Sequence, residues 1–472
     1  MHFSIPDTQQ LCDDSGKYTG YNLHLNGEYH CSVRYKQLHN FNEQLKKLYG
    51  PENVPSFPPK KLFPLSVIQI EERRTHLEKY MQSLAQSNLL RTCELVISFL
   101  LLAQQESYGE EIRDVSVEIY LMNNVQTTIT IASNDSYSIV LERVCNELCL
   151  PNTYIYYFAL FLVSYSGDKH LSIIRKLQPY ECPYISQKTI PGSLRLYLMK
   201  NYWDLEYDLE LMTDPVGLDI LYAQAVSDVH RESIVVHKDT KTILNQLEAS
   251  GAKKEYVDLA RKLKYYGFIE FEPCTCDFPK PNTKVVVNIG LREINFRIRS
   301  SEGEIREGTF KVTRMRCWKI TINKEEDNDA SNARHNTSQA NQTQLSFEYL
   351  LAKNKLQWIT IQSNQAILMS NLLQSIIDEL VLKKTHEDEG RTVRNGNGGN
   401  SFYYMKRDGS SQITSPSISS TELDSNSSNG SNESRTSLRR SSGKLSSVGM
   451  KVMGKSPFVE NDAFEGIGDD DL

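Results

Sequence analysis

The residues best suited to bind a charged ligand lie near the amino terminus, around a pair of prolines. Arg34, Tyr35 and Lys36 are consecutive, Lys60 directly follows the prolines, and Arg73 falls beside the apolar face of a predicted helix. A guanidinium group can hold a phosphate through two hydrogen bonds, and lysine adds a point charge. The pattern predicts a phosphate-binding site. Separate surface charges, with arginine stems packed on the core, are the alternative.

A tryptophan and a helix with two apolar rows form a second candidate site. Trp318 lies in an alternating segment, and a final helix is predicted over 364–384. One apolar row is enough to pack this helix on a sheet, so the other could line a groove in which an extended peptide adds a strand. The alternative is that Trp318 and both rows belong to the core. The two rows are Leu372, Ile376, Leu380 and Leu373, Ile377, Val381.

The carboxyl-terminal segment, 459–472, is acidic and ends in a leucine. One pocket could take both the Leu472 side chain and the terminal carboxylate, so the segment is a candidate partner-binding motif. A solubilising acidic tail is the alternative.

Catalytic and metal sites find little support in the sequence. The segment 449–456 matches the phosphate-loop pattern G-x-x-x-x-G-K-S, but that loop needs a buried strand before it and a helix after it. Here polar residues precede it and Pro457 follows. The nine cysteines are scattered without a Cys-x-x-Cys pair, which favours reduced thiols over disulfides or zinc. We expect no enzyme, no cofactor and no metal; a nucleotidase or a phosphoinositide-processing enzyme is the alternative from another class.

The polar character of the chain is concentrated in its last part. The protein has 472 residues, a formal net charge of -6 and 39% hydrophobic residues. The sequence is ordinary globular sequence up to about residue 386, and a serine-rich stretch, 387–458, is predicted to be a disordered linker. No apolar run approaches the length of a membrane-spanning helix, and the amino terminus lacks a signal-peptide pattern.

The periodicity changes several times along the globular part, which predicts an α+β multidomain protein. Residues 1–108 begin with an Asn26-Gly27 hairpin and continue with helices, and 115–200 show hairpin, helix and strands, as in a ubiquitin-like lobe. Residues 201–272 are helical, and 273–386 are strands closed by one helix, the outline of a PH/PTB-like barrel.

The order of features in the first domain resembles a PX domain, a reader of phosphoinositides. The resemblance implies that Arg34 grips the 3-phosphate of phosphatidylinositol 3-phosphate and that Tyr35 packs under the inositol ring. It also implies that Lys60 contacts the 1-phosphate side and Arg73 the far ring hydroxyls. PX domains commonly carry serine where this chain has Lys36, which removes a hydroxyl contact and adds positive charge.

The three following lobes resemble a FERM domain, and PX followed by an atypical FERM is similar to a small group of sorting nexins. The strings that carry this resemblance are Phe57-Pro-Pro-Lys-Lys-Leu-Phe, Val216-Gly-Leu-x-x-Leu-Tyr-Ala-Gln, Val312-Thr-Arg-Met-Arg-Cys-Trp and Phe464-Glu-Gly-Ile-Gly-Asp-Asp-Asp-Leu. The family implies a monomeric cargo adaptor, cytoplasmic and peripheral on early and recycling endosomes, without a nucleic-acid partner. An effector of small GTPases, acting through 115–200, is a second hypothesis of the same class.

The resemblance also assigns the two remaining sites. It implies that Trp318, Ile377 and Val381 contact Asn-Pro-x-Tyr or Asn-x-x-Tyr signals in receptor tails of the integrin and lipoprotein-receptor type. It implies that the ending recruits the retriever recycling complex, so that receptors return to the cell surface instead of being degraded in lysosomes. Asn461 and Phe464 form a related Asn-x-x-Phe sequence. We hypothesise that the tail occupies its own groove until cargo displaces it.

Overall fold

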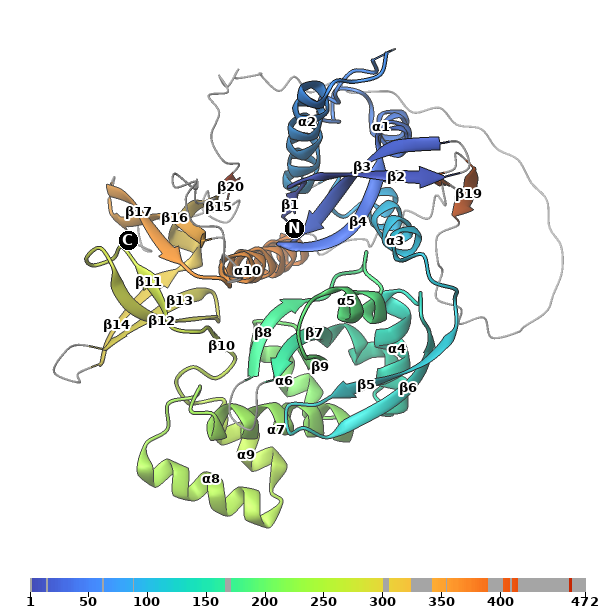
Figure 1. The fold of residues 1–472 in the computed structure, drawn as a ribbon. Helices are drawn as coiled ribbons and strands as arrows, with labels where there is room; N and C mark the ends of the chain where they lie inside the picture. Colours follow the sequence, from blue (N-terminus) through green and yellow to red (C-terminus); the bar gives the residue numbers. More distant parts are fainter. Residues whose placement is uncertain are drawn as a thin grey trace, which may run out of the picture.

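The computed structural model shows two modules and short parts of the tail (Figure 1). The mixture of helix and sheet confirms the α+β multidomain class expected from the periodicity. No helix among the residues that the structure describes is long and apolar enough to cross a membrane. The described residues are 2–13, 16–61, 63–87, 89–165, 171–299, 305–323, 342–353, 355–388, 402–407, 410–414 and 458–460.

The first module is a small antiparallel sheet covered by three helices. The β3–β4 hairpin turns at Asn26 and Gly27, both with positive φ (53° and 92°), a conformation that suits asparagine and glycine. The Ser66 hydroxyl accepts the Gln69 backbone N–H, which starts α2 with the expected capping box. The elements are β1 (Phe3–Ser4), β2 (Thr8–Asp13), β3 (Gly16–Leu25), β4 (Glu28–Arg34), α1 (Tyr35–Tyr49), α2 (Val67–Gln86) and α3 (Glu94–Tyr108).

The second module consists of three lobes, which are called the second, third and last lobes because they follow the first module. The second lobe has a five-stranded sheet in the order β6-β5-β9-β7-β8, with β5 and β9 parallel. Its core lies between this sheet and α4, where Val140 and Val144 are fully buried. The elements are β5 (Asp114–Tyr120), β6 (Gln126–Ala132), α4 (Tyr137–Glu147), η1 (Asn152–Tyr157), β7 (Phe158–Tyr165), β8 (Leu171–Lys176), α5 (Pro183–Thr189) and β9 (Leu194–Lys200).

The third lobe is helical. Asp214 caps α7 by accepting the Gly217 backbone N–H at 2.8 Å, and Pro215 occupies the first helical position. The elements are α6 (Glu206–Leu211), α7 (Pro215–His230), α8 (Lys238–Ser250) and α9 (Lys253–Ala260).

The last lobe is a strongly bent sheet closed by one long helix, α10. Its strands follow the order β14-β13-β12-β11-β17-β16-β15, with the short β10 on β12. Without the tail, β15 would be an edge strand. The elements are β10 (Ile269–Glu270), β11 (Cys274–Cys276), β12 (Thr283–Gly290), β13 (Glu293–Arg299), β14 (Ile305–Lys311), η2 (Val312–Arg314), β15 (Met315–Asn323), β16 (Gln342–Ala352), β17 (Lys355–Gln362) and α10 (Ala366–Asp388).

Helix α10 connects the modules, and Figure 1 shows it between the first module and the last sheet. Asp378 accepts a hydrogen bond from Arg91 of the first module at 2.7 Å. On the same helix, Glu379 accepts the backbone N–H of Trp203 at 2.8 Å. Tyr180 of the second lobe reaches the core of the first module. Polar and apolar contacts therefore join the first module to the lobes.

Two short pieces of the tail adopt regular structure. β18 (Phe402–Met405) pairs with β19 (Ser411–Thr414), and β20 (Phe458–Glu460) pairs antiparallel with β15. These strands and the end of α10 are the regular structure described within or beside the predicted linker 387–458, most of which lies outside the described residues. The physical reason is tertiary: β18 lies against the first module and β20 against a sheet edge, contacts that local composition does not reveal.

Candidate ligand-binding sites

Arg34 is the last residue of β4 and immediately precedes α1, so its side chain lies at the junction between this strand and the amino terminus of the helix. Its guanidinium carbon lies 3.7 Å from the centroid of the Tyr18 ring, a cation–π contact. The Arg34 backbone N–H donates to Gln37 Oε1 at 2.9 Å, which fixes the backbone at this corner. Tyr18, which was not identified from the sequence, lies on β3 two residues before Gly20, the residue that pairs with Arg34.

Arg73 and Tyr35 form the adjoining half of the site. The Arg73 guanidinium lies 4.1 Å from the Tyr35 ring centroid, and the Tyr35 hydroxyl donates to the Pro58 carbonyl at 2.8 Å. Burial raises the pKa of the Tyr35 hydroxyl above its ordinary value. Phe57 packs on the same ring with centroids 5.5 Å apart. The diproline segment is thus held against α1, and the two arginines are held by neighbouring aromatic rings.

The two lysines are exposed. Lys36 lies in the first turn of α1, and Lys60 follows the diproline segment that Tyr35 anchors. The structure therefore holds Arg34 on Tyr18 and Arg73 on Tyr35, two cation–π pairs joined through the consecutive residues Arg34 and Tyr35, and leaves both lysines at the surface. Their contact with a ligand stays a prediction.

The second site lies at the edge of the last sheet. Strand β15 pairs with β16 on one side and with β20 on the other, with Trp318 opposite Val459 and Cys317 opposite Glu460. The tail therefore adds a strand at the position where a peptide ligand could pair. Asn461, Phe464 and Leu472 lie outside the described residues, as does the 449–456 motif.

Trp318 is buried in the core of the last lobe, and its contact with a peptide stays a prediction. Its side chain is 0% exposed, and its Nε1 donates to Ser370 Oγ of α10 at 2.9 Å. Met315, three residues earlier, is equally buried. Strict alternation would place these two residues on opposite faces, but a bulge between Met315 and Cys317 shifts the pattern. Trp318 thus links β15 to α10 beneath the β15 edge.

The two helix rows are also mostly core. Ile377 is 3% exposed, whereas Val381, one turn further along α10, is 38% exposed. Of the three predicted peptide-contacting residues, only Val381 is accessible at the surface. Contact of any of them with a peptide stays a prediction.

Replacing Trp318 with alanine should destabilise the protein by about 3–5 kcal/mol, as expected for a large buried aromatic side chain. Trp358, on β17 of the same sheet and separated from β15 by β16, is 37% exposed and provides the matched control. Urea denaturation followed by circular dichroism should show a clearly lower midpoint for Trp318→Ala than for Trp358→Ala. Equal midpoints would contradict the core assignment.

Within the described part of the chain, no group of three or more histidine, cysteine, aspartate or glutamate side chains could hold a metal ion. The cationic cluster at Arg34 and Arg73 and the β15 edge are therefore the candidate sites. The first suits a phosphorylated ligand, and the second suits an extended peptide.

Comparisons with known proteins identify each module. Residues 21–102 match the PX domain model, and residues 115–203 match the F1 lobe model of the sorting nexin 17/27/31 FERM domain. Residues 204–264 match the F2 lobe model of sorting nexins 17 and 31, and residues 267–381 the sorting nexin 17 FERM C-terminal domain.

Full-length relatives give the same result. The chain is 42% identical to sorting nexin-17 of Danio rerio and 41% identical to sorting nexin-17 of Homo sapiens, in each case over 100% of both chains. It is 31% identical to sorting nexin-31 of Homo sapiens over 82% of this chain and 88% of that one. The similarity therefore includes the tail as well as the folded modules.

Proposed function

The chain belongs to the sorting nexin-17 family of endosomal sorting adaptors, and from this premise we propose that it joins a phosphoinositide membrane to receptor tails. The PX domain binds phosphatidylinositol 3-phosphate, and the last FERM lobe binds Asn-Pro-x-Tyr or Asn-x-x-Tyr signals. The carboxyl terminus, ending at Leu472, recruits the retriever complex, so that receptors recycle instead of reaching lysosomes.

The arrangement of Arg34 and Arg73 carries the lipid part of this proposal. Their guanidinium groups are held on the rings of Tyr18 and Tyr35, so less conformational freedom is lost when a phosphate binds. The exposed Lys36 and Lys60 add positive charge around this cluster, which favours an anionic membrane surface.

The edge of β15 carries the cargo part. Backbone groups of β15 can pair with an extended chain, since β20 does so, and Val381 of α10 is exposed. A peptide bound there would receive affinity from the sheet ladder and specificity from side chains on α10. Binding of lipid and cargo on one membrane would raise their effective concentration, so two modest affinities would suffice.

Introducing a charge at Val381 tests the cargo part. Because Val381 is 38% exposed, Val381→Asp should leave the fold intact. We expect about tenfold weaker binding of an Asn-Pro-x-Tyr peptide, measured by calorimetry, because an apolar contact becomes a desolvated charge. Ile243→Asp, on α8 of the helical lobe with 49% exposure, is the matched control. Equal peptide affinities in the two variants would refute this assignment of the groove.

A further inference from the structure

The β18–β19 hairpin is attached to the PX domain mainly through Arg407. The Arg407 Nη2 donates to the Ser32 carbonyl and to Ser107 Oγ, both at 2.6 Å. Its backbone N–H donates to Glu106 Oε1 at 2.7 Å. Ser32 lies on β4, and Glu106 and Ser107 lie in the last turn of α3. A tail residue is therefore built into the seam between a sheet strand and a helix of the first module.

The same hairpin contacts Arg34, the residue predicted to bind a phosphate. Arg34 Nη1 donates to the Arg407 carbonyl oxygen at 2.6 Å. Next to it, Gln37 Nε2 donates to the Met405 carbonyl at 3.0 Å and to Glu106 Oε2 at 2.9 Å. The backbone carbonyls of Met405 and Arg407 thus accept hydrogen bonds at the start of α1, where β4 ends. Strand β18 lies against α1 and α3, and Figure 1 shows β19 on the side of the PX domain away from the last sheet.

We propose that the segment 402–414 is an internal competitor for the phosphoinositide headgroup at Arg34. This inference rests on the proposed lipid function of that site. A backbone carbonyl is a neutral acceptor, so it satisfies an Arg34 N–H without supplying the charge that a phosphate would supply. A phosphate that binds the Nη1–Nη2 edge of Arg34 competes with the Arg407 carbonyl for Nη1. The hairpin then leaves its seam, or shifts within it.

The expected consequence is a reduced affinity of the full chain for lipid. When a binding-competent state is only partly populated, the apparent affinity falls by the populated fraction. The hydrogen bonds that hold Arg407 in place set that fraction here. Weakening the docking without touching Arg34 should therefore strengthen lipid binding, and lipid should in turn release the hairpin, because coupling between two sites is reciprocal.

If the hairpin promoted membrane binding instead of competing with the lipid, the variants would give the opposite result. Lys406 and Arg407 are both cationic, so a docked hairpin could instead add charge to the membrane-binding face. Under that alternative, removing either charge would weaken binding. The two side chains differ in burial: Lys406 is exposed, whereas Arg407 is half-buried in the seam. Lys406→Ala is therefore a control with the same loss of charge.

The experiment uses the full chain and vesicles with and without phosphatidylinositol 3-phosphate, together with the soluble headgroup inositol 1,3-bisphosphate. Arg407→Ala should bind both about three- to tenfold more tightly than the unchanged protein, because two hydrogen bonds from a guanidinium group are lost. A chain with residues 402–414 replaced by a glycine-serine segment of equal length should show at least the same gain. Lys406→Ala should show none.

Unchanged or weaker binding by Arg407→Ala and by the glycine-serine chain would overturn the proposal. That result differs from a failure of the proposed lipid function, which would appear as an absence of binding by the unchanged protein itself. Proteolysis within the hairpin provides a second measurement. Cleavage should accelerate when the lipid is added to the unchanged protein, and an unaltered cleavage rate on saturated vesicles would also contradict displacement.

Discussion

A chain that ends at residue 457 should bind an Asn-Pro-x-Tyr peptide about tenfold more tightly than the full chain, because a tethered strand competes at a raised effective concentration. Strand β20 pairs with β15 through residues Cys317–Lys319, at the edge where the peptide is proposed to pair. Two strands cannot use the same backbone groups of β15. Truncation removes the competitor and leaves the groove intact.

The control for this truncation is deletion of Leu472 alone. That deletion removes the terminal leucine but leaves β20, so the peptide affinity should stay at the level of the full chain. Calorimetric titration of one peptide into the three proteins gives the comparison. Identical dissociation constants for the full chain and for the chain ending at 457 would show that β20 does not compete with cargo.

The second large effect concerns the lipid site. Arg34→Ala should weaken binding to vesicles containing phosphatidylinositol 3-phosphate by about a hundredfold, since hydrogen bonds to a charged phosphate contribute about 1.5–3 kcal/mol each. The fold should persist, because the Arg34 backbone N–H to Gln37 and the Tyr35 to Pro58 hydrogen bond do not involve the Arg34 side chain. Vesicle sedimentation measures the loss.

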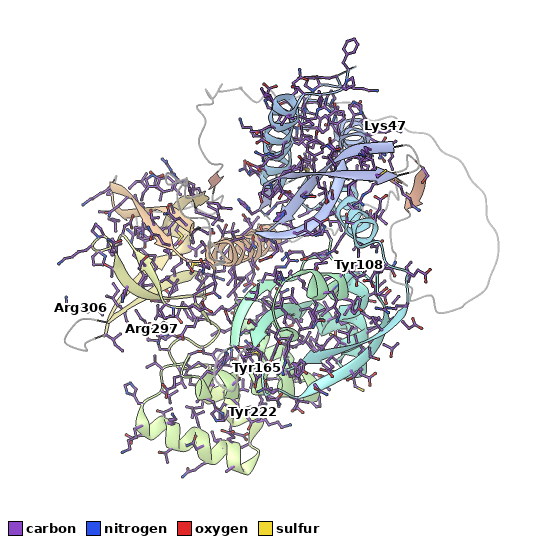
Figure 2. All side chains as sticks on the ribbon, in the orientation of Figure 1. Lys47, Tyr108, Tyr165, Tyr222, Arg297 and Arg306 are labelled. Carbon is purple, nitrogen blue, oxygen red and sulfur yellow. The ribbon has the colours of Figure 1, made fainter. Side chains whose placement is uncertain are left out.

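Lys47→Ala is the control for this variant. Lys47 is exposed in the last turn of α1, and Figure 2 labels it. The substitution Lys47→Ala removes one positive charge, as Arg34→Ala does, but at the opposite end of α1. Any nonspecific attraction to the membrane is therefore reduced equally in the two variants. A loss of binding as large in Lys47→Ala as in Arg34→Ala would show that net charge, and not the Arg34 fork, holds the lipid.

Local sequence was sufficient for elements whose signals lie within a few residues. The Asn26-Gly27 hairpin, the Ser66 capping box and the Asp214-Pro215 helix start are all present in the structure. Each depends on short-range chemistry: a positive φ, a side chain that accepts an N–H, or a fixed proline φ. The family follows from the order of such elements together with longer strings of sequence, and the full-length comparisons confirm it.

Side-chain direction was less accessible from the sequence. The alternating pattern around Trp318 could not reveal the bulge that places it beside Met315 in the core. Likewise, two apolar rows on α10 are compatible with a groove or with a core, and only Val381 of the predicted contacts is exposed. Periodicity reports that a residue belongs to one face; it does not report what covers that face.

The sequence by itself determined the modules, their order and the cationic residues of the proposed lipid site, because these depend on residue type and short spacing. Only the tertiary structure decided where the tail lies. Arg407 meets Arg34 across a separation of 373 residues, and Val459 of β20 meets Trp318 of β15 across a separation of 141 residues. Such contacts form when complementary hydrogen-bonding groups are left at a strand edge or in a seam between elements, and those groups exist only once the modules have folded.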